Sequence, residues 1–573
     1  MNQLELIAEN IKNKKLDKAL ELCKLNENSN NKEIIYNFIG VIYFIKKEFA
    51  EAEKNFLNSI KIDDQFQDPI RNLCVIYANT KEFKKLLNFS TKLYNLDNSN
   101  PLNIFQIGSA HELNKNFDDA IKYYEQFIST NGSDKKMGYN NIGNIYLRKG
   151  KPKTSINYFS KALELDSNNK VLVNNILLCY LYLRDVNKAE EYFRKAELID
   201  SDYIEFLHNK AEYLILKNQI QDAEKILDEN KNITKFLITL IRLYFNSGQN
   251  SKGNELLNKS RELLKNDPDF YNYLGIRYLY EGNFDEGWKY YEYRKSKLTH
   301  FFQEIKEWDG SNIKDKSIVV YNEQGLGDSI QFSKYLVPLS KVAKQVTFVV
   351  QENIKNLFKN SKNINVETYQ KCKNQIFDYK ISLGSLIKHF YKEKINFDDN
   401  FLQLNLSKDL NLENKIDFSK KNIGIVWSGS FLGPNEPYRS IPLQNFSNIL
   451  NLDANFYALQ NEVWERDLQA FHSSNLINFG DYKLGEISSL ISKLDLVITS
   501  DTSLLHLAAT LNVETWGILC LYPDWRWGEF NKFNPYPKLK LYQQKKFNNW
   551  DFINDEIYEL LKKKIILNYT DIP

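Results

Sequence analysis

The sequence predicts an α-solenoid followed by an α/β domain of two halves, each with its own sheet. Three observations lead to this fold class. A pair of small and large apolar residues recurs about every 34 residues through the first half of the chain. Short apolar, β-branched runs alternate with helical stretches in the second half. The composition changes near residue 300, because all eight tryptophans lie at or after Trp288 and eight of the twelve prolines lie after residue 300.

The net charge and the cysteine spacing indicate which binding partners and which kinds of site the protein is not expected to have. The 573-residue chain has 76 Lys and Arg against 73 Asp and Glu, a net charge of +3, so its composition does not call for a nucleic-acid or acidic-membrane partner. The five cysteines are scattered without a C-x-x-C pair, which indicates a reducing compartment and neither a disulfide framework nor a zinc site. We expect no signal peptide and no transmembrane helix, and therefore a cytoplasmic protein. We also expect no metal ion or other cofactor.

The repeated pair is a small or apolar residue followed four positions later by an aromatic residue or leucine. Successive pairs lie 34, 34, 35, 34, 34, 30 and 34 residues apart, and the one aberrant pair keeps its register. This spacing predicts helix pairs that cross at the small residues, with the aromatic residues in the core. The pairs are Ala52/Phe56, Leu86/Ser90, Ala120/Tyr124, Ser155/Phe159, Ala189/Phe193, Ala223/Leu227, Gly253/Leu257 and Gly287/Tyr291.

A 34-residue helix–turn–helix with small residues at the crossing resembles the tetratricopeptide repeat. The resemblance implies a stacked array over residues 1–297 whose concave groove takes an extended peptide or a partner protein. Asn and Lys on the other faces indicate solvated surface, and no recognition residue can be chosen among them. Residues 298–316 are expected to be a linker containing the turn Trp308-Asp309-Gly310.

The α/β domain is expected to divide into residues 317–418 and 419–573. The pattern predicts strands at 317–321, 346–350 and 377–382 in one half, and at 423–427, 455–459, 476–479, 496–499 and 515–519 in the other. Two Rossmann-like halves in tandem, with a helix at 552–563 in position to cross back, describe the GT-B glycosyltransferase fold. A single larger doubly wound domain is the alternative, which the second strand–turn start at 423 makes less favourable.

The turn after the first strand reads Glu323-Gln324-Gly325-Leu326-Gly327-Asp328. A strand, a turn with two glycines and a helix opened by an aspartate are typical of the start of a doubly wound sheet. The glycines allow a tight turn and leave room for a ligand against the backbone. On the alternative interpretation, Gly325 and Gly327 only make the turn and Asp328 only caps the helix.

Three further signals follow strands of the second half. Ser428 and Gly429 come directly after a strand, and a loop then leads to Arg439, which stands before Ser-Ile-Pro and a helix and can pair bidentately with a phosphate. A surface arginine is the alternative. The loop Pro523-Asp-Trp-Arg-Trp527 offers Trp525 and Arg526, where aromatic rings can pack on a sugar or base, or only on the domain.

The remaining signal is Asp501-Thr502-Ser503-Leu-Leu-His506, which opens a helix after the strand at 496–499. Free backbone N–H groups at a helix start form a site for a diphosphate, and the hydroxyls of Thr502 and Ser503 add donors. The alternative makes Asp501 a helix cap and His506 a packed core residue.

Together, in this order and spacing, these motifs resemble the glycosyltransferase family 9-like domain that is fused to tetratricopeptide repeats in bacterial proteins, and that is similar to the ADP-heptose:lipopolysaccharide heptosyltransferases. The resemblance covers about residues 305–565. It implies that Asp328 is the general base, that Arg439 stands where heptosyltransferases commonly have lysine to neutralise the donor phosphates, and that Asp501 to His506 form the phosphate loop. Ser503 replaces the glycine of that loop, so heptose transfer does not follow.

The resulting prediction is a metal-independent, inverting glycosyltransferase that moves a sugar from a nucleotide-diphosphate sugar to a hydroxyl of a protein or surface-glycan acceptor. The expected partners are the nucleotide-sugar and a protein or peptide in the repeat groove. The alternative is a non-catalytic tetratricopeptide scaffold with a degenerate glycosyltransferase domain, against which the joint presence of Asp328, Arg439, Asp501 and His506 argues.

Overall fold

The computed structural model describes residues 3–27, 29–265, 267–297, 302, 304–361, 363–393, 416–429, 438–480, 484–533 and 536–567. The loop at 430–437 and parts of the predicted linker lie outside the described residues. Contacts divide the chain into two compact units, Met1–Tyr180 with Glu190–Ser201, and Leu181–Ala189 with Asp202–Pro573. None of the described helices is long and apolar enough to span a membrane.

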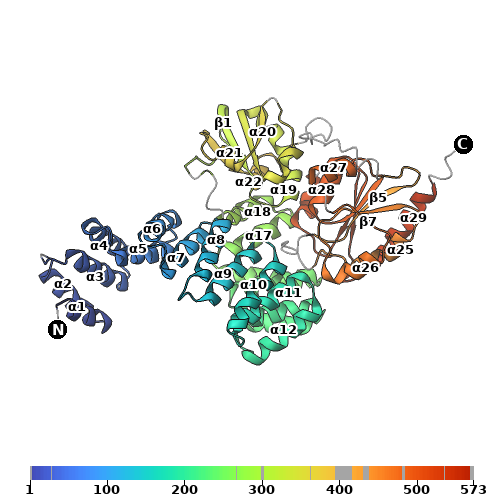
Figure 1. Ribbon diagram of the computed structural model, residues 1–573. Coiled ribbons are helices and arrows are strands. Elements are labelled where there is room, and N and C mark those ends of the chain that lie inside the picture. Colours follow the sequence, from blue (N-terminus) through green and yellow to red (C-terminus); the bar gives the residue numbers. More distant parts are fainter. Residues whose placement is uncertain are drawn as a thin grey trace. The chain divides into compact units, whose positions relative to one another are not determined.

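The first unit consists of helix pairs, which Figure 1 draws in colours from blue to green. An alanine at Gly40 would place its Cβ 2.5 Å from the ring of Phe56, and one at Gly143 would lie 2.6 Å from Phe159, so small residues are needed where paired helices cross. The helices are α1 (Gln3–Lys12), α2 (Leu16–Leu25), α3 (Lys32–Ile45), α4 (Phe49–Ile62), α5 (Gln67–Asn79), α6 (Phe83–Leu96), α7 (Pro101–Leu113), α8 (Phe117–Ser129), α9 (Lys135–Arg148), α10 (Pro152–Leu165), and most of α11 (Lys170–Leu183) and α12 (Val186–Ile199).

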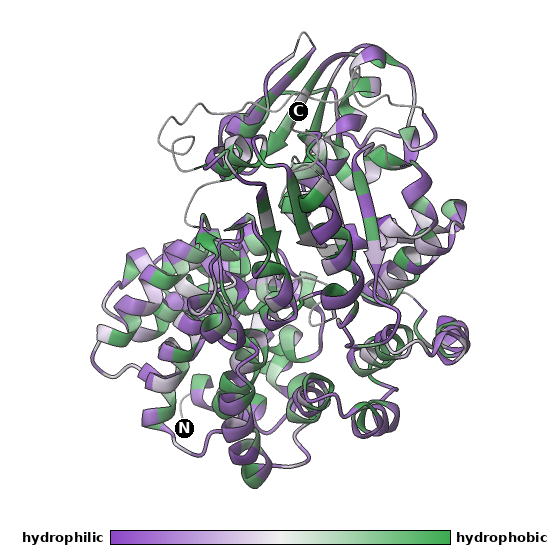
Figure 2. Cartoon of the chain, turned by 90° about the vertical axis from the view of Figure 1, so that its right-hand side faces the viewer, coloured by the Kyte–Doolittle hydropathy of each residue, from purple (hydrophilic) through white to green (hydrophobic). Residues whose placement is uncertain are grey.

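The second unit begins with three more helix pairs and continues into two sheets. Its first helices are α13 (Ile204–Leu216), α14 (Ile220–Glu229), α15 (Thr234–Asn246), α16 (Asn250–Leu263), α17 (Pro268–Glu281) and α18 (Phe284–Tyr291). No strand precedes residue 300 in the described part of the chain. Figure 2 shows hydrophobic residues concentrated in the strands, whereas hydrophobic and hydrophilic residues alternate along the repeat helices.

The first half of the α/β domain has a parallel four-stranded sheet in the order β3-β2-β1-β4. Its elements are β1 (Ile313–Tyr321), α19 (Leu326–Phe332), α20 (Leu336–Val342), β2 (Ala343–Val350), β3 (Ile364–Thr368), α21 (Tyr369–Cys372), β4 (Tyr379–Ser382) and α22 (Leu383–Phe390). Strand β1 takes in Ile313–Lys316, which were expected to belong to the linker, because Ile313 pairs with Ala343 before the register shifts at Ser317. Strand β3 was not predicted.

The second half has a parallel six-stranded sheet in the order β10-β9-β8-β5-β6-β7. Two separate sheets of this kind confirm the predicted fold class, an α-solenoid followed by an α/β domain of two Rossmann-like halves. The elements are β5 (Asn422–Val426), α25 (Ser447–Leu450), β6 (Asn455–Ala458), α26 (Leu468–His472), β7 (Ile477–Asn478), α27 (Leu484–Ile491), β8 (Leu496–Ser500), α28 (Ser503–Thr510), β9 (Thr515–Leu519), β10 (Leu539–Gln543) and α29 (Tyr558–Leu567).

Shared cores join the last repeats to both halves of the domain. Leu279 and Trp288 are buried in one cluster with residues of the first sheet. Ala211 and Leu240 are buried in another with Trp427. The last three helix pairs therefore share buried cores with both halves of the α/β domain.

The C-terminal helix differs from its prediction. It begins with a π-helical turn, Ile553–Ile557, and continues as α29. Leu561 and Ile565 are buried with Ile449 of the second half. The described part of α29 thus packs on the second half, within the residue range 419–573 expected for that half, and does not cross back to the first half.

Candidate functional site

One cavity of about 1140 Å³ collects almost all the residues that the sequence singled out. It lies at the carboxyl ends of parallel strands, where open α/β sheets bind ligands. Helices α13, α15 and α17 of the last repeats also line it. The predicted site residues that line it are Gln324, Gly325, Gly327, Asp328, Gly429, Arg439, Asp501, Thr502, Ser503, His506, Trp525 and Arg526.

Asp328 both caps a helix and borders the cavity, although the sequence analysis treated the cap and the ligand site as alternatives. Its Oδ2 accepts a hydrogen bond from the backbone N of Gly325 at 2.9 Å, which caps α19. Its Oδ1 pairs with the guanidinium of Arg526, and the residue borders the cavity. The helix start therefore holds the carboxylate in one orientation at the cavity wall.

Arg526 connects the two halves through this pair. Its guanidinium also pairs with Asp524, on the same loop after β9. Burial alone would lower the pKa of Arg526, but the two carboxylates outweigh that effect and hold the pKa well above its ordinary value. The Nε of Arg526 is buried and has no hydrogen-bond partner in the described part of the chain.

Arg439 lies over the start of the phosphate loop. Its Nη1 donates to the carbonyl of Asp501 at 2.8 Å, and the N of Ile441 donates to the carbonyl of Trp427 at 2.8 Å, which ties the Arg439 segment to the end of β5. A Cβ at Gly429 would lie 2.6 Å from the Nη2 of Arg439, so glycine leaves room for the guanidinium.

The start of α28 faces the glycine turn of the first half. A Cβ at Gly327 would lie 3.1 Å from the ring of His506 and 3.3 Å from the Cα of Ser503. Burial raises the pKa of Asp501, Asp524 adds to the shift, and the guanidinium groups of Arg439 and Arg526 oppose it. The two lobes therefore approach each other at Gly327, and the larger cavity opens beside that contact.

His506 lies in the cavity wall as a neutral imidazole. Burial, together with the charges of Arg526 and Lys334, lowers the pKa of His506 well below its ordinary value. Its ring stacks on Trp527 at 5.4 Å between centroids, and its Nδ1 lies 3.4 Å from the Tyr536 hydroxyl. A neutral imidazole can donate or accept one hydrogen bond here, but it adds no positive charge for a phosphate.

Of the cleft candidates, Ser428 is placed differently from expectation, and Trp525 follows the alternative of packing on the domain. Ser428 does not line the cavity: it is buried, and its Oγ accepts a hydrogen bond from the Nε2 of Gln460 at 2.9 Å. Trp525 borders the cavity, but its ring is buried between Trp288 and Phe332, at centroid distances of 5.6 and 6.0 Å. Ser428 therefore anchors a loop, and Trp525 packs on the domain and offers no exposed face to a sugar or base.

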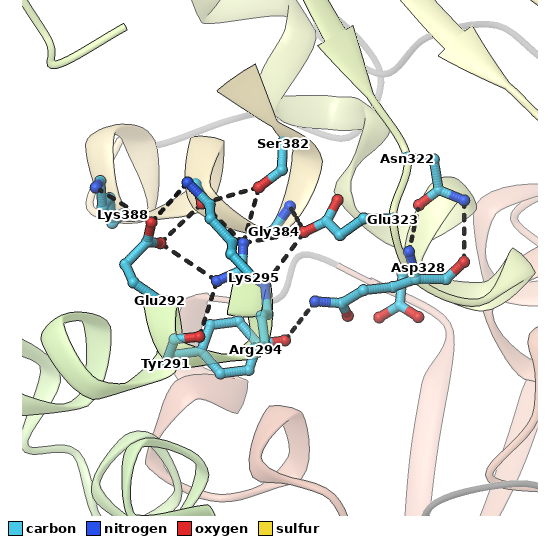
Figure 3. Close-up of polar contacts among 12 residues, drawn as sticks. Tyr291, Glu292, Arg294, Lys295, Asn322, Glu323, Asp328, Ser382, Gly384 and Lys388 are labelled. Carbon is cyan, nitrogen blue, oxygen red and sulfur yellow. Dashed lines mark hydrogen bonds and ion pairs between the residues drawn. The ribbon is translucent and has the colours of Figure 1, made fainter. Parts of the chain in front are cut away.

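Glu323 and Arg294 form a buried ion pair beside the glycine turn, which the sequence did not reveal (Figure 3). The Nη2 of Arg294 donates to the Oε1 of Glu323 at 2.9 Å and to the hydroxyls of Ser382 and Ser385 at 2.9 and 2.7 Å. The N of Gly384 donates to the same Oε1 at 3.1 Å. This network joins the last repeat to the turn that carries Asp328.

The repeat helices supply a wall of the cavity that sequence reasoning also missed. His208 of α13 bonds to the hydroxyl of Thr239 of α15 at 3.0 Å. From α17, the Oδ1 of Asn272 and the hydroxyl of Tyr273 are buried without a hydrogen-bond partner in the described residues. These positions lie outside the repeated small–aromatic pattern, so periodicity could not mark them. No group of three or more His, Cys, Asp and Glu that could hold a metal ion occurs among the residues described.

Family models match both parts of the chain. Tetratricopeptide repeat models match residues 34–66, 103–134, 137–169 and 172–203. The model described as glycosyltransferase family 9 (heptosyltransferase) matches residues 458–547, which hold the phosphate loop and Arg526.

Curated relatives and solved structures resemble parts of the chain. The human protein O-mannosyl-transferase TMTC3 is 27% identical over 34% of this chain and 23% of its own length. The RNA polymerase-associated protein CTR9 of Saccharomyces cerevisiae is 28% identical over 29% of this chain and 17% of its own length. The chain thus spans less than a quarter of these relatives.

Among solved structures, a tetratricopeptide repeat protein from Parabacteroides merdae matches with a TM-score of 0.35, 13% identity, and coverage of 42% of this chain and 96% of that one. The structure titled APC/C hetero-tetramer Cut9-Hcn1 matches with a TM-score of 0.33, 20% identity, and coverage of 41% of this chain and 48% of that one. By its family models, the chain carries tetratricopeptide repeats and, within residues 458–547, a match to glycosyltransferase family 9 (heptosyltransferase).

Proposed function

We propose that the protein is an inverting glycosyltransferase that transfers a sugar from a nucleotide-diphosphate sugar to an acceptor hydroxyl without a metal ion. The observation that carries this proposal is the common cavity of Asp328, Arg439 and the start of α28. A carboxylate stands on one side of it, and a cation and a helix N-terminus stand on the other, as transfer from a diphosphate requires.

In the proposed reaction, the acceptor oxygen attacks the anomeric carbon while the bond from that carbon to the diphosphate oxygen breaks. Asp328 takes the proton of the acceptor hydroxyl. Arg439 and the backbone N–H groups at the start of α28 stabilise the charge on the leaving diphosphate. Attack from the side opposite the leaving group inverts the anomeric centre.

The acceptor is proposed to be a protein or a group delivered by one. Helices α13, α15 and α17 line the same cavity as Asp328, so an acceptor held by these repeats reaches the proposed base directly. Such tethering raises the effective concentration of its hydroxyls. The mannosyltransferase in the name of the TMTC3 relative fits this proposal, although the match covers only part of each chain.

The test is a screen of the purified full chain against nucleotide-sugars, for binding and for turnover. Arg439→Ala is expected to weaken donor binding roughly ten- to hundredfold, because it removes a charge-assisted contact with phosphate. Arg194→Ala is the matched control, since Arg194 is an exposed helical residue paired with Glu190. Absence of binding to every nucleotide-sugar in wild type, or equal affinities in the two variants, would contradict the donor site and favour the non-catalytic scaffold.

A further inference from the structure

Arg526 reaches from the second half of the domain to the proposed base in the first half. It belongs to the loop after β9, and its guanidinium pairs both with Asp524 on that loop and with Asp328 on α19. The side chains of Arg526 and Asp328 are 14% and 13% exposed, so the pair is largely shielded from water. A charge-assisted contact in such surroundings occupies the carboxylate firmly.

The same guanidinium also lies within reach of the proposed diphosphate site. Arg439, Ser503 and Arg526 line one cavity, and the electrostatic influence of both arginines acts on Asp501. The Nε of Arg526 is buried without a hydrogen-bond partner in the described residues, so the contacts with the two carboxylates leave one N–H of the guanidinium unsatisfied, and a rotation of the side chain can satisfy it. A diphosphate is the kind of acceptor that a planar guanidinium binds best.

The loop itself is anchored, which leaves the side-chain end of Arg526 as the part free to change partners. The hydroxyl of Tyr522 accepts a hydrogen bond from the Nη1 of Arg277 at 2.6 Å, and the Tyr522 ring stacks on Phe245 at 5.1 Å. Trp525 is packed among aromatic rings of the last repeat and the first half. An exchange of partners by Arg526 thus needs a rotation of its side chain and no movement of the loop.

We propose that Arg526 is a positioning residue shared between Asp328 and the donor's diphosphate, and that it sets the order in which the substrates are used. The inference rests on the proposed function. When the diphosphate takes over the guanidinium, Asp328 loses its counter-ion and is free to accept the acceptor's proton. The base is therefore released only with a donor in place, and the donor binds before the acceptor.

If Arg526 exchanges Asp328 for the diphosphate, removal of the Asp328 carboxylate should strengthen diphosphate binding, which a purely structural Arg526–Asp328 pair does not predict. Asp328→Asn keeps the shape and the cap on α19 but ends the competition for Arg526. Inorganic pyrophosphate should then bind the full chain roughly ten- to hundredfold more tightly than it binds wild type, as measured by titration calorimetry. Asp269→Asn removes a carboxylate from the exposed rim of the same cavity and is the control for the general loss of negative charge, with an expected change of less than about threefold.

A double-substitution cycle assigns the effect to Arg526. In an Arg526→Gln background, Asp328→Asn should no longer tighten pyrophosphate binding, because there is no guanidinium to release. If Arg526→Gln does not fold, as judged by tryptophan fluorescence, Arg526→Lys takes its place, and the gain from Asp328→Asn should shrink.

The outcomes separate the two proposals. Pyrophosphate binding that is unchanged by Asp328→Asn, tightened as much by Asp269→Asn, or tightened equally in the Arg526 backgrounds would overturn the exchange while leaving the donor site intact. Wild-type protein that binds neither pyrophosphate nor any nucleotide-sugar would overturn the proposed function and the exchange together.

Discussion

His208 is a single buried residue whose charge state should be visible in the stability of the second unit. Burial, aided by the charges of Lys235 and Arg242, lowers the pKa of His208 from 6.5 to about 3. The unfolded chain therefore binds a proton that the folded chain refuses, so stability is full above pH 6.5 and falls as the pH drops below it. Between pH 6.5 and pH 5 this one residue should remove about 2 kcal/mol.

The measurement is the free energy of unfolding at pH 7 and pH 5, for wild type and His208→Gln. Glutamine does not titrate, so the substitution should cost clearly less at pH 5 than at pH 7. Because all eight tryptophans lie at or after Trp288, tryptophan fluorescence reports on the second unit. His472→Gln on the exposed surface is the control, and an identical cost of His208→Gln at both pH values would refute the assignment.

The sequence predicted the position of the candidate site better than it predicted the contacts of each side chain. The motif order identified Asp328, Arg439 and the 501–506 turn because glycines and helix caps leave a local signature. The surroundings of Ser428 and Trp525 come from distant segments, so the sequence did not place Ser428 outside the cavity or decide between the two interpretations of Trp525: Gln460 holds Ser428, and Trp288 packs on Trp525. The pairs Arg526–Asp328 and Arg294–Glu323 also join residues far apart in the chain, which no local pattern marks.

At the scale of elements, the close crossing of α17 and α18 supports the cavity wall. A Cβ at Gly275 would meet the backbone N of Tyr291 and lie 2.7 Å from the carbonyl carbon of Tyr290. Backbone atoms cannot move aside as a flexible side chain can. Gly275→Ala should therefore lower the free energy of unfolding by roughly 1–3 kcal/mol.

Gly485→Ala is the matched control, because a Cβ there meets no atom of the described residues within 4 Å and α27 should gain up to about 1 kcal/mol. Thermal and urea unfolding followed by tryptophan fluorescence compares the two variants. Equal stabilities would mean that α17 and α18 do not cross as closely as described.

Elements were predicted well where burial imposes a strong pattern and poorly where it does not. The repeat helices and central strands such as β1 and β8 have runs of buried apolar residues. Strands β3 and β10 were missed; both lie at sheet edges, as do the predicted strands β4 and β7, and β10 is only partly buried along its length. An edge strand needs less apolar surface, so its alternation is weak.

At the scale of the whole molecule, the repeats and the domain are less separate than periodicity indicates. The repeated pairs continue to Tyr291, with one shorter interval of 30 residues, yet helices α13–α18 share buried clusters with both sheets. Periodicity records how each helix pair packs on its neighbours and carries no information about what else covers its other face. The last repeats thus form one wall of the cavity in which we propose that sugar transfer takes place.

The central claim, that Asp328 is the base of a glycosyl transfer, is tested most directly by one comparison. Turnover and nucleotide-sugar binding are measured side by side for the wild-type full chain and Asp328→Asn, with the donor found by screening. Asparagine keeps the helix cap but cannot take a proton, so turnover should fall by roughly two to four decades while the nucleotide-sugar still binds. Turnover that survives the substitution, or donor binding that is lost together with turnover, would contradict the account.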